Sequence, residues 1–118
     1  MFISVDPAVS MPPYEQIRVQ VRDAVAAGVL AAGAKLPTVR ALADELGLAV
    51  NTVARAYREL ETDGIIETRG RAGSFVAPQG DAASQQAQTA AREFVERARR
   101  LGLDDASALD LVRAAQRG

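Results

Sequence analysis

The sequence of 118 residues contains no cysteine and no histidine. Without cysteine there is no disulfide framework and no thiolate chemistry. Without histidine the chain lacks the commonest general base and the commonest metal ligand. Carboxylates, hydroxyls, tyrosines and Lys35 remain, and no pair of them stands in a recognisable catalytic arrangement. We therefore expect no catalytic residue, no metal site, no cofactor and no enzymatic activity.

Long apolar runs are also missing. No stretch reaches the roughly 20 apolar residues that are needed to cross a bilayer. Residues 1–6 are apolar at Phe2, Ile3 and Val5, but they lack the basic start and the long apolar run of a signal peptide. We interpret residues 1–6 as a starting strand or arm, and we expect a cytoplasmic protein without membrane contact.

An excess of positive charge is absent as well. The chain carries 14 Lys and Arg against 15 Asp and Glu, a formal charge of -1. Residues 1–80 hold 8 basic residues (Lys35 and seven Arg) and 9 acidic ones, whereas many DNA-binding domains are clearly basic. Any binding to nucleic acid must rest on a local cation cluster: Lys35, Arg40, Arg55, Arg58, Arg69 and Arg71. We expect weak non-specific affinity and a salt slope of about 0.9 per neutralised phosphate.

Residues 36–64 predict two short helices joined by a tight turn. In the first, residues 39–46, apolar side chains recur at three- and four-residue spacing, and Gly47 supplies the left-handed backbone on which helices often end. The second spans about residues 51–63. Its inward positions are Val53, Ala56, Tyr57 and Leu60.

The outer face of that second helix carries Asn51, Thr52, Arg55 and Arg58. A polar helix held across a short turn by a preceding helix is the helix-turn-helix layout that places side chains in the DNA major groove. There Asn pairs with adenine and Arg with guanine. An ordinary solvated helix face accounts for the same residues equally well.

A hairpin is predicted directly after the second helix. Two β-like runs, residues 65–68 and 74–77, flank a loop that contains Arg69, Gly70 and Arg71. A helix-turn-helix followed by such a hairpin is a winged helix, and the wing arginines can enter a minor groove or neutralise phosphates.

An N-terminal helix precedes this motif. Pro12 and Pro13 suit a first helical turn, and the helix is expected to reach about Ala27. Its expected inward residues are Tyr14, Ile17, Val21, Ala24 and Val25, and its expected water-facing residues are Gln16, Arg18, Gln20 and Asp23. Residues 29–37 are interpreted as a connector, with Thr38 as the cap of the next helix.

Residues 11–77 resemble the DNA-binding domain of the GntR family of bacterial transcription regulators. The matching residues are Pro13-Tyr14, Gln16-Ile17, Gly28, Leu30, Gly33, Leu36-Pro37, Val39-Arg40, Leu42-Ala43, Asn51-Thr52-Val53, Arg55-Ala56-Tyr57, Leu60-Glu61, Gly64-Ile65-Ile66 and Gly73-Ser74-Phe75-Val76. So many ordered matches are a far more specific signal than one short motif. Ala49 and Val50 depart from the pattern, because a polar residue and often a proline precede the Asn-Thr pair in this family.

The resemblance implies DNA-binding roles on three elements. The residues are Arg40 on the first helix of the motif, Asn51, Thr52 and Arg55 on the second, and Arg69, Gly70 and Arg71 in the wing. Arg58 belongs to the same candidate set. Arg40 could instead pair with Asp44, Arg58 could pair with Glu61 or Thr62, and Gly70 could serve backbone shape alone.

The C-terminal segment reads as two helices after a small polar linker. Residues 84–101 and a helix that starts at Asp104 each carry an apolar stripe. Two such helices are too small to form a core, so they must pack on a partner subunit or on the winged-helix domain. We favour a homodimer through Phe94, Val95, Ala98, Leu101, Leu109 and Val112. Such a tail is similar to that of the short YtrA-type subgroup, in which two helices serve dimerisation.

The sequence therefore predicts a mainly α fold with a small β-hairpin wing. Residues 1–78 form a winged helix-turn-helix DNA-binding domain, and residues 79–118 form a two-helix dimerisation segment. The expected function is a GntR-type transcription regulator, a homodimeric repressor on a pseudo-palindromic double-stranded DNA operator, with an unidentified small-molecule effector as a further partner. The alternative is a winged-helix protein-interaction module without a DNA role.

Overall fold

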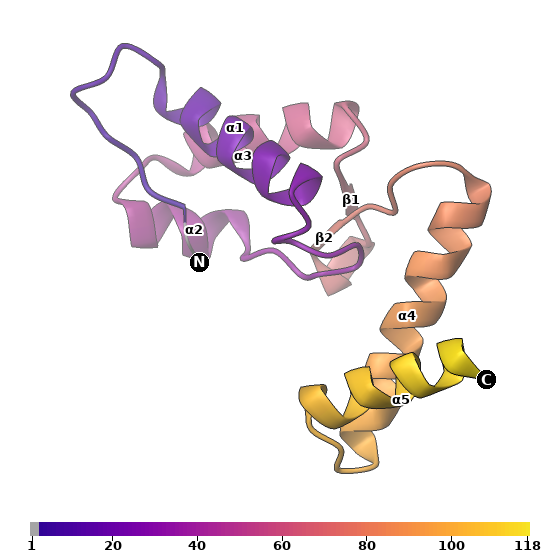
Figure 1. Ribbon diagram of the computed structural model, residues 1–118. Coiled ribbons are helices and arrows are strands. Elements are labelled where there is room, and N and C mark those ends of the chain that lie inside the picture. Colours follow the sequence, from indigo (N-terminus) through magenta and orange to yellow (C-terminus); the bar gives the residue numbers. More distant parts are fainter. Residues whose placement is uncertain (1–2) are drawn as a thin grey trace. The chain divides into compact units, whose positions relative to one another are not determined.

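The computed structural model describes residues 3–118 and divides the chain into two compact units, Met1–Gln79 and Gly80–Gly118 (Figure 1). The first unit contains α1 (Pro13–Ala26), α2 (Val39–Leu46), α3 (Val50–Thr62), β1 (Ile66–Thr68), a short 3-10 turn (Gly70–Ala72) and β2 (Ser74–Val76). The second contains α4 (Ala82–Arg100) and α5 (Asp105–Arg117). The prediction of a mainly α fold with a small β-hairpin wing is confirmed.

The core of the first unit lies where α1 and α2 pack on α3 and where α3 meets the hairpin. It is made of aliphatic side chains that are fully buried: Ile17, Val21, Leu42, Val53, Leu60, Ile66 and Val76. All come from positions that recur at helical spacing or alternate along a strand, so burial of these stripes fixes how α3 is presented to solvent.

The two motif helices begin differently. Thr38 caps α2, since its hydroxyl accepts a hydrogen bond from the backbone N–H of Ala41 at 3.1 Å. Gly47 ends α2 with a left-handed φ of 68°. By contrast α3 begins after Ala49, which makes no side-chain cap. The Thr38 cap was expected from the sequence, whereas the start of α3 lacks the hydrogen bond that a polar N-cap residue would supply.

Capping yields a first testable prediction. We expect Thr38→Ala to lower the free energy of unfolding by about 1 kcal/mol and Ala49→Ser to raise it by about 0.5 kcal/mol. Ala49 already has the extended backbone of an N-cap, with φ -66° and ψ 143°, so serine fits without rearrangement. Urea unfolding followed by circular dichroism measures both changes. Destabilisation by Ala49→Ser would contradict this account of how α3 begins.

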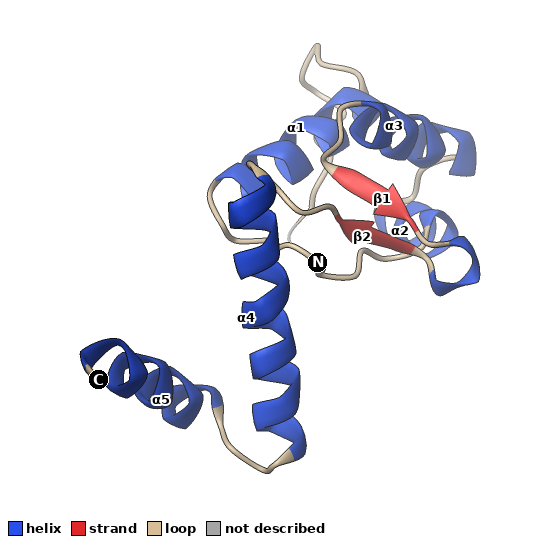
Figure 2. Cartoon of the chain, turned by 90° about the vertical axis from the view of Figure 1, so that its right-hand side faces the viewer, coloured by secondary structure: helices blue, strands red, loops and turns tan. Residues whose placement is uncertain are grey.

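The hairpin is short, and a third segment supports it. β1 and β2 pair antiparallel in the register Ile66↔Val76, Glu67↔Phe75 and Thr68↔Ser74 (Figure 2). Lys35 bridges to Phe75 on the other edge of β2. The backbone N–H of Leu36 donates to the carbonyl of Ser74 at 2.9 Å. The stretch before α2, expected as a plain connector, thus pairs with the wing.

Residues 3–6 run beside α1 as an extended arm and form no strand. Met1 and Phe2, also part of that expectation, lie outside the described residues. Gln16 holds the arm: its side-chain oxygen accepts from the N–H of Asp6 at 2.9 Å, and its amide donates to the carbonyls of Asp6 and Met11. The prediction that Gln16 faces water is wrong, because satisfying these backbone groups requires its burial.

In the second unit, α4 starts at Ala82, two residues earlier than expected, because Asp81 caps it by accepting from the N–H of Ser84 at 2.8 Å. Asp104 caps α5 in the same way through Ser107. These hydrogen bonds hold the pKa of each aspartate below its usual range. The two helices pack through small buried residues, Ala98 and Ala108.

Candidate nucleic-acid interface

The outward face of α3 is polar along its length. Val53, Ala56, Tyr57 and Leu60 are buried, and on the opposite side Asn51, Arg55, Arg58 and Thr62 are exposed. Thr52 is only partly exposed. The helix therefore presents one amide and two guanidinium groups to solvent, which is the donor and acceptor set that reads purine edges.

One buried hydrogen bond ties α3 to the start of α2. The hydroxyl of Tyr57 donates to the carbonyl of Pro37 at 2.6 Å. Burial raises the pKa of Tyr57, so the hydroxyl stays protonated and remains a donor. The bond fixes the segment that leads into Thr38 and Arg40, and thereby sets where Arg40 lies relative to α3.

Arg40 lies in the first turn of α2 and is exposed. Within residues 3–118 it forms no ion pair, and the pairing with Asp44 considered from the sequence does not occur. Arg58 likewise has no ion pair there; only its backbone carbonyl is engaged, as the acceptor for the hydroxyl of Thr62 at 2.9 Å. Both guanidinium groups are therefore available to an external anion.

Arg55 is engaged within the protein. Its Nε lies 3.9 Å from Oε1 of Glu59, and its Cζ lies 3.7 Å from the centroid of the Tyr14 ring on α1. Its side chain nevertheless keeps 53% of its exposure. Of the candidate residues on α3, Arg55 is thus the one whose direction is set by the protein itself.

The wing arginines differ from each other. Arg69 forms an ion pair with Glu67 at 2.6 Å and stacks 4.4 Å from the centroid of Phe75. Arg71 is exposed, with no ion pair in the described part of the chain. Gly70 has a φ of 53° and begins the 3-10 turn, which contains Arg71 and directly follows Arg69. Lys35 approaches the Phe75 ring as well, with Nζ 6.0 Å from the centroid.

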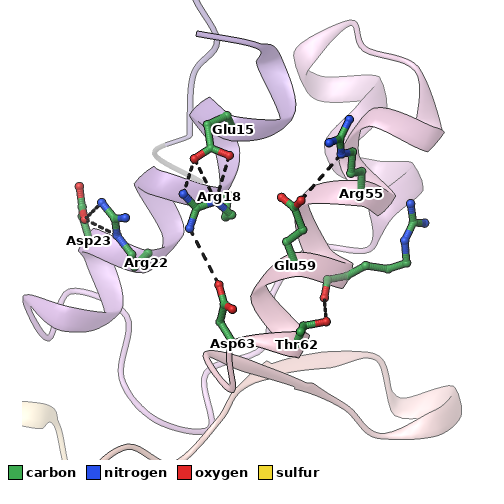
Figure 3. A network of polar contacts seen from close by, with 9 residues as sticks. Glu15, Arg18, Arg22, Asp23, Arg55, Glu59, Thr62 and Asp63 are labelled. Atoms are coloured by element: carbon green, nitrogen blue, oxygen red, sulfur yellow. Dashed lines mark hydrogen bonds and ion pairs between the residues drawn. The ribbon is translucent and has the colours of Figure 1, made fainter.

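The side of α3 that meets α1 carries negative charge. Glu15, Glu59 and Asp63 line a polar recess there together with Arg18. Arg18 forms an ion pair with Glu15 and reaches Asp63 at 4.0 Å (Figure 3). Carboxylates repel phosphates, so a duplex is disfavoured beside the C-terminal end of α3, where Asp63 lines this recess with Glu15.

The apolar face of the tail is open. Phe94, Leu109 and Val112 remain 37%, 49% and 38% exposed and line a groove between α4 and α5. Val95 is half-buried in the same groove, and Leu101 is 65% exposed outside it. Ala98 is already buried within one chain, so it is not part of the free surface.

Sequence reasoning did not find the aromatic partners of the arginines. Tyr14 was assigned to the core and Phe75 only to the hairpin. Each ring meets a guanidinium across the fold or across the sheet, 41 residues away for Tyr14 and Arg55. No local pattern signals such a contact.

Comparison with known proteins agrees with this geometry. Residues 13–76 match the bacterial regulatory proteins of the gntR family. The chain is 49% identical over 108 residues to the HTH-type transcriptional regulator Rv1152 of Mycobacterium tuberculosis, covering 92% of this chain and 88% of that protein. It is 47% identical over 76 residues to the HTH-type transcriptional repressor YtrA of Bacillus subtilis, covering 64% and 58%.

The similarity to solved structures extends into the C-terminal helices. YtrA from Sulfolobus acidocaldarius, a GntR-family transcription factor, superposes with a TM-score of 0.61 at 28% identity over 96% of this chain and 95% of that one. Among residues 3–118, no helix has the length and apolar character needed to cross a membrane. A family match that covers the winged helix, together with relatives that extend over nearly the whole chain, leads to one conclusion. The chain belongs to the gntR family of bacterial regulatory proteins and is a DNA-binding transcription regulator of that type.

Proposed function

We propose that the protein acts as a homodimeric, sequence-specific repressor. In this proposal α3 enters the major groove with Asn51, Arg55 and Arg58, while Arg40 and the wing residues Arg69, Gly70 and Arg71 engage the neighbouring backbone and minor groove. Thr52, partly exposed at the start of α3, supplies a phosphate contact.

The observation that carries the proposal is the set of unpaired guanidinium groups. The first unit has no surplus of positive charge, yet Arg40, Arg58 and Arg71 are left without ion pairs among the described residues, while acidic groups gather on the α1 side of α3. Unpaired arginines on a folded surface are ready to meet phosphate or guanine without first breaking an internal ion pair.

The tail supplies the dimer in this proposal. An apolar groove between α4 and α5 leaves Phe94, Leu109 and Val112 accessible to water, and a second copy would bury the same face on both chains. Residues 1–78 then act as the DNA-binding domain and residues 79–118 as the dimerisation segment. Two recognition helices related by a two-fold axis match two half-sites of a pseudo-palindrome.

Repression follows from position alone, since a dimer over a promoter blocks polymerase without further chemistry. The B. subtilis relative is named a repressor. We assign no enzymatic activity, and we place the protein in the cytoplasm, where a bacterial chromosome lies. An effector that binds in the tail groove would act by changing the dimer.

Arg40→Ala tests the DNA role. We expect affinity for DNA from the protein's own upstream region to fall about tenfold or more, because a guanidinium contact to a base or phosphate is lost. Fluorescence anisotropy with a labelled duplex measures this. Arg22→Ala is the matched control: Arg22 is exposed on α1 and pairs with Asp23 at 3.0 Å, so its loss should change affinity less than twofold.

The same measurement separates the alternatives. Equal binding by Arg40→Ala and wild type would contradict this interface. No binding by either, with both folded, would favour an interaction module instead.

A further inference from the structure

The guanidinium of Arg55 is held on two sides. Its Cζ lies over the Tyr14 ring, 3.7 Å from the centroid, and its Nε lies 3.9 Å from the carboxylate of Glu59. Figure 3 shows the carboxylate of Glu59 facing Arg55, with a dashed line for the ion pair between them. A stacked guanidinium uses its face for the ring and keeps its N–H edge for acceptors, since the donors lie in the plane.

Tyr14 is itself fixed. Tyr14 is the second residue of α1. Its side chain is half-buried and packs against the core of the first unit. One turn further along α1, Arg18 pairs with Glu15 and reaches Asp63 beyond the end of α3. The hydrogen bond from Arg18 is the main reason why the pKa of Glu15 is lowered, and the charge of Arg55 adds to it. α1 and α3 are therefore joined at two places, by Tyr14 and Arg55 and by Arg18 and Asp63.

We propose that Tyr14 is a positioning residue for operator recognition: its ring holds Arg55 in the direction in which the N–H edge meets a base. This inference rests on the proposed DNA-binding function of α3 and extends it to a residue of α1, outside the recognition helix. Ordering a long side chain at an interface weakens binding, and ordering it beforehand removes that cost. The benefit applies to a base contact, which needs one orientation, and not to diffuse attraction by phosphates.

Three variants test the proposal in the full-length chain. Tyr14→Phe keeps the ring, Tyr14→Leu keeps only apolar volume, and Arg55→Ala removes the positioned group. We expect Tyr14→Phe to bind the operator within twofold of wild type. Tyr14→Leu should bind it about two- to fivefold more weakly, the range that a lost cation–π contact predicts, with affinity for an unrelated duplex unchanged. In the Arg55→Ala background, Tyr14→Leu should have no further effect.

A second readout needs no DNA. Ring current from Tyr14 should shift the Nε–H proton of Arg55 upfield in an NMR spectrum, and the shift should persist in Tyr14→Phe and vanish in Tyr14→Leu. If Tyr14→Leu unfolds, the unbranched Tyr14→Met replaces it.

The outcomes are distinct. Loss of operator affinity by Tyr14→Leu that is equally large in the Arg55→Ala background would overturn the inference, because Tyr14 would then act through the fold alone. Wild type that is folded and shows the shifted Arg55 proton but binds no duplex would overturn the proposed function, and the DNA role of Tyr14 with it.

Discussion

Leu109→Asp is expected to leave the protein monomeric and to weaken operator binding by roughly 100-fold or more. Two linked heads bind two half-sites with an avidity that exceeds single-site affinity by about 10² to 10⁴. Leu109 lines the tail groove and is 49% exposed in one chain. An aspartate there would place a charge in an apolar contact between two copies, which is strongly unfavourable unless the charge is paired.

Leu111 offers a matched control on the same helix. It is also 49% exposed, but it does not line the groove, since two residues along a helix turn a side chain to nearly the opposite side. Leu111→Asp should remain dimeric. Light scattering at micromolar concentration measures the mass, and anisotropy measures operator affinity. A wild-type mass near one 12.5 kDa chain, or equal dissociation by both variants, would contradict the groove as the dimer surface.

Leu60→Ala is expected to lower the free energy of unfolding by about 3 kcal/mol, within the usual span for a buried leucine. Leu60 is 0% exposed on α3 and belongs to the core of the first unit, which joins α1, α2 and α3 to the hairpin. Removing its isobutyl group leaves a cavity under the recognition helix. For a small domain such a loss is a large part of total stability, so operator binding should vanish at a temperature at which wild type still binds.

A second pair of variants shows that burial is the cause. Val53 is 0% exposed on α3, whereas Val29 is 68% exposed in the connector. The same Val→Ala change should cost about 1.5 kcal/mol at Val53 and close to nothing at Val29. Urea unfolding monitored by circular dichroism gives both numbers. An equal loss of unfolding free energy at the two sites would mean that the first unit lacks the tight core described above.

The elements were predictable because their signals are local. Apolar spacing located α2, α3 and the tail helices to within one or two residues, and Gly47 and Thr38 marked the ends of α2 correctly. What failed depends on distant partners. Gln16 reads as a polar helix residue, but the arm brings the backbone of Asp6 and Met11 to it, so it is buried. The pairing of Lys35 with Phe75 is made by backbone groups that every residue type possesses.

The candidate interface was predictable in part for the same reason. Helical phase places Asn51, Arg55 and Arg58 on the exposed face of α3, as the sequence indicated. Which arginines are paired was not predictable, because this depends on side-chain reach in three dimensions. Arg69 pairs with Glu67 two residues away, whereas Arg40 and Asp44, at an ideal helical spacing, do not pair.

The bridge between Lys35 and β2 has a mechanical consequence. The N–H of Gly33 donates to the carbonyl of Val76 at 2.7 Å, and the N–H of Val76 donates to the carbonyl of Ala34 at 2.8 Å, so the inner edge of the hairpin is stitched to the stretch that leads into α2. A tilt of the wing would therefore also move the N-terminal end of α2. We therefore expect the wing and the start of α2 to keep a fixed spacing when the protein meets a duplex, so that a duplex with differently spaced grooves binds more weakly.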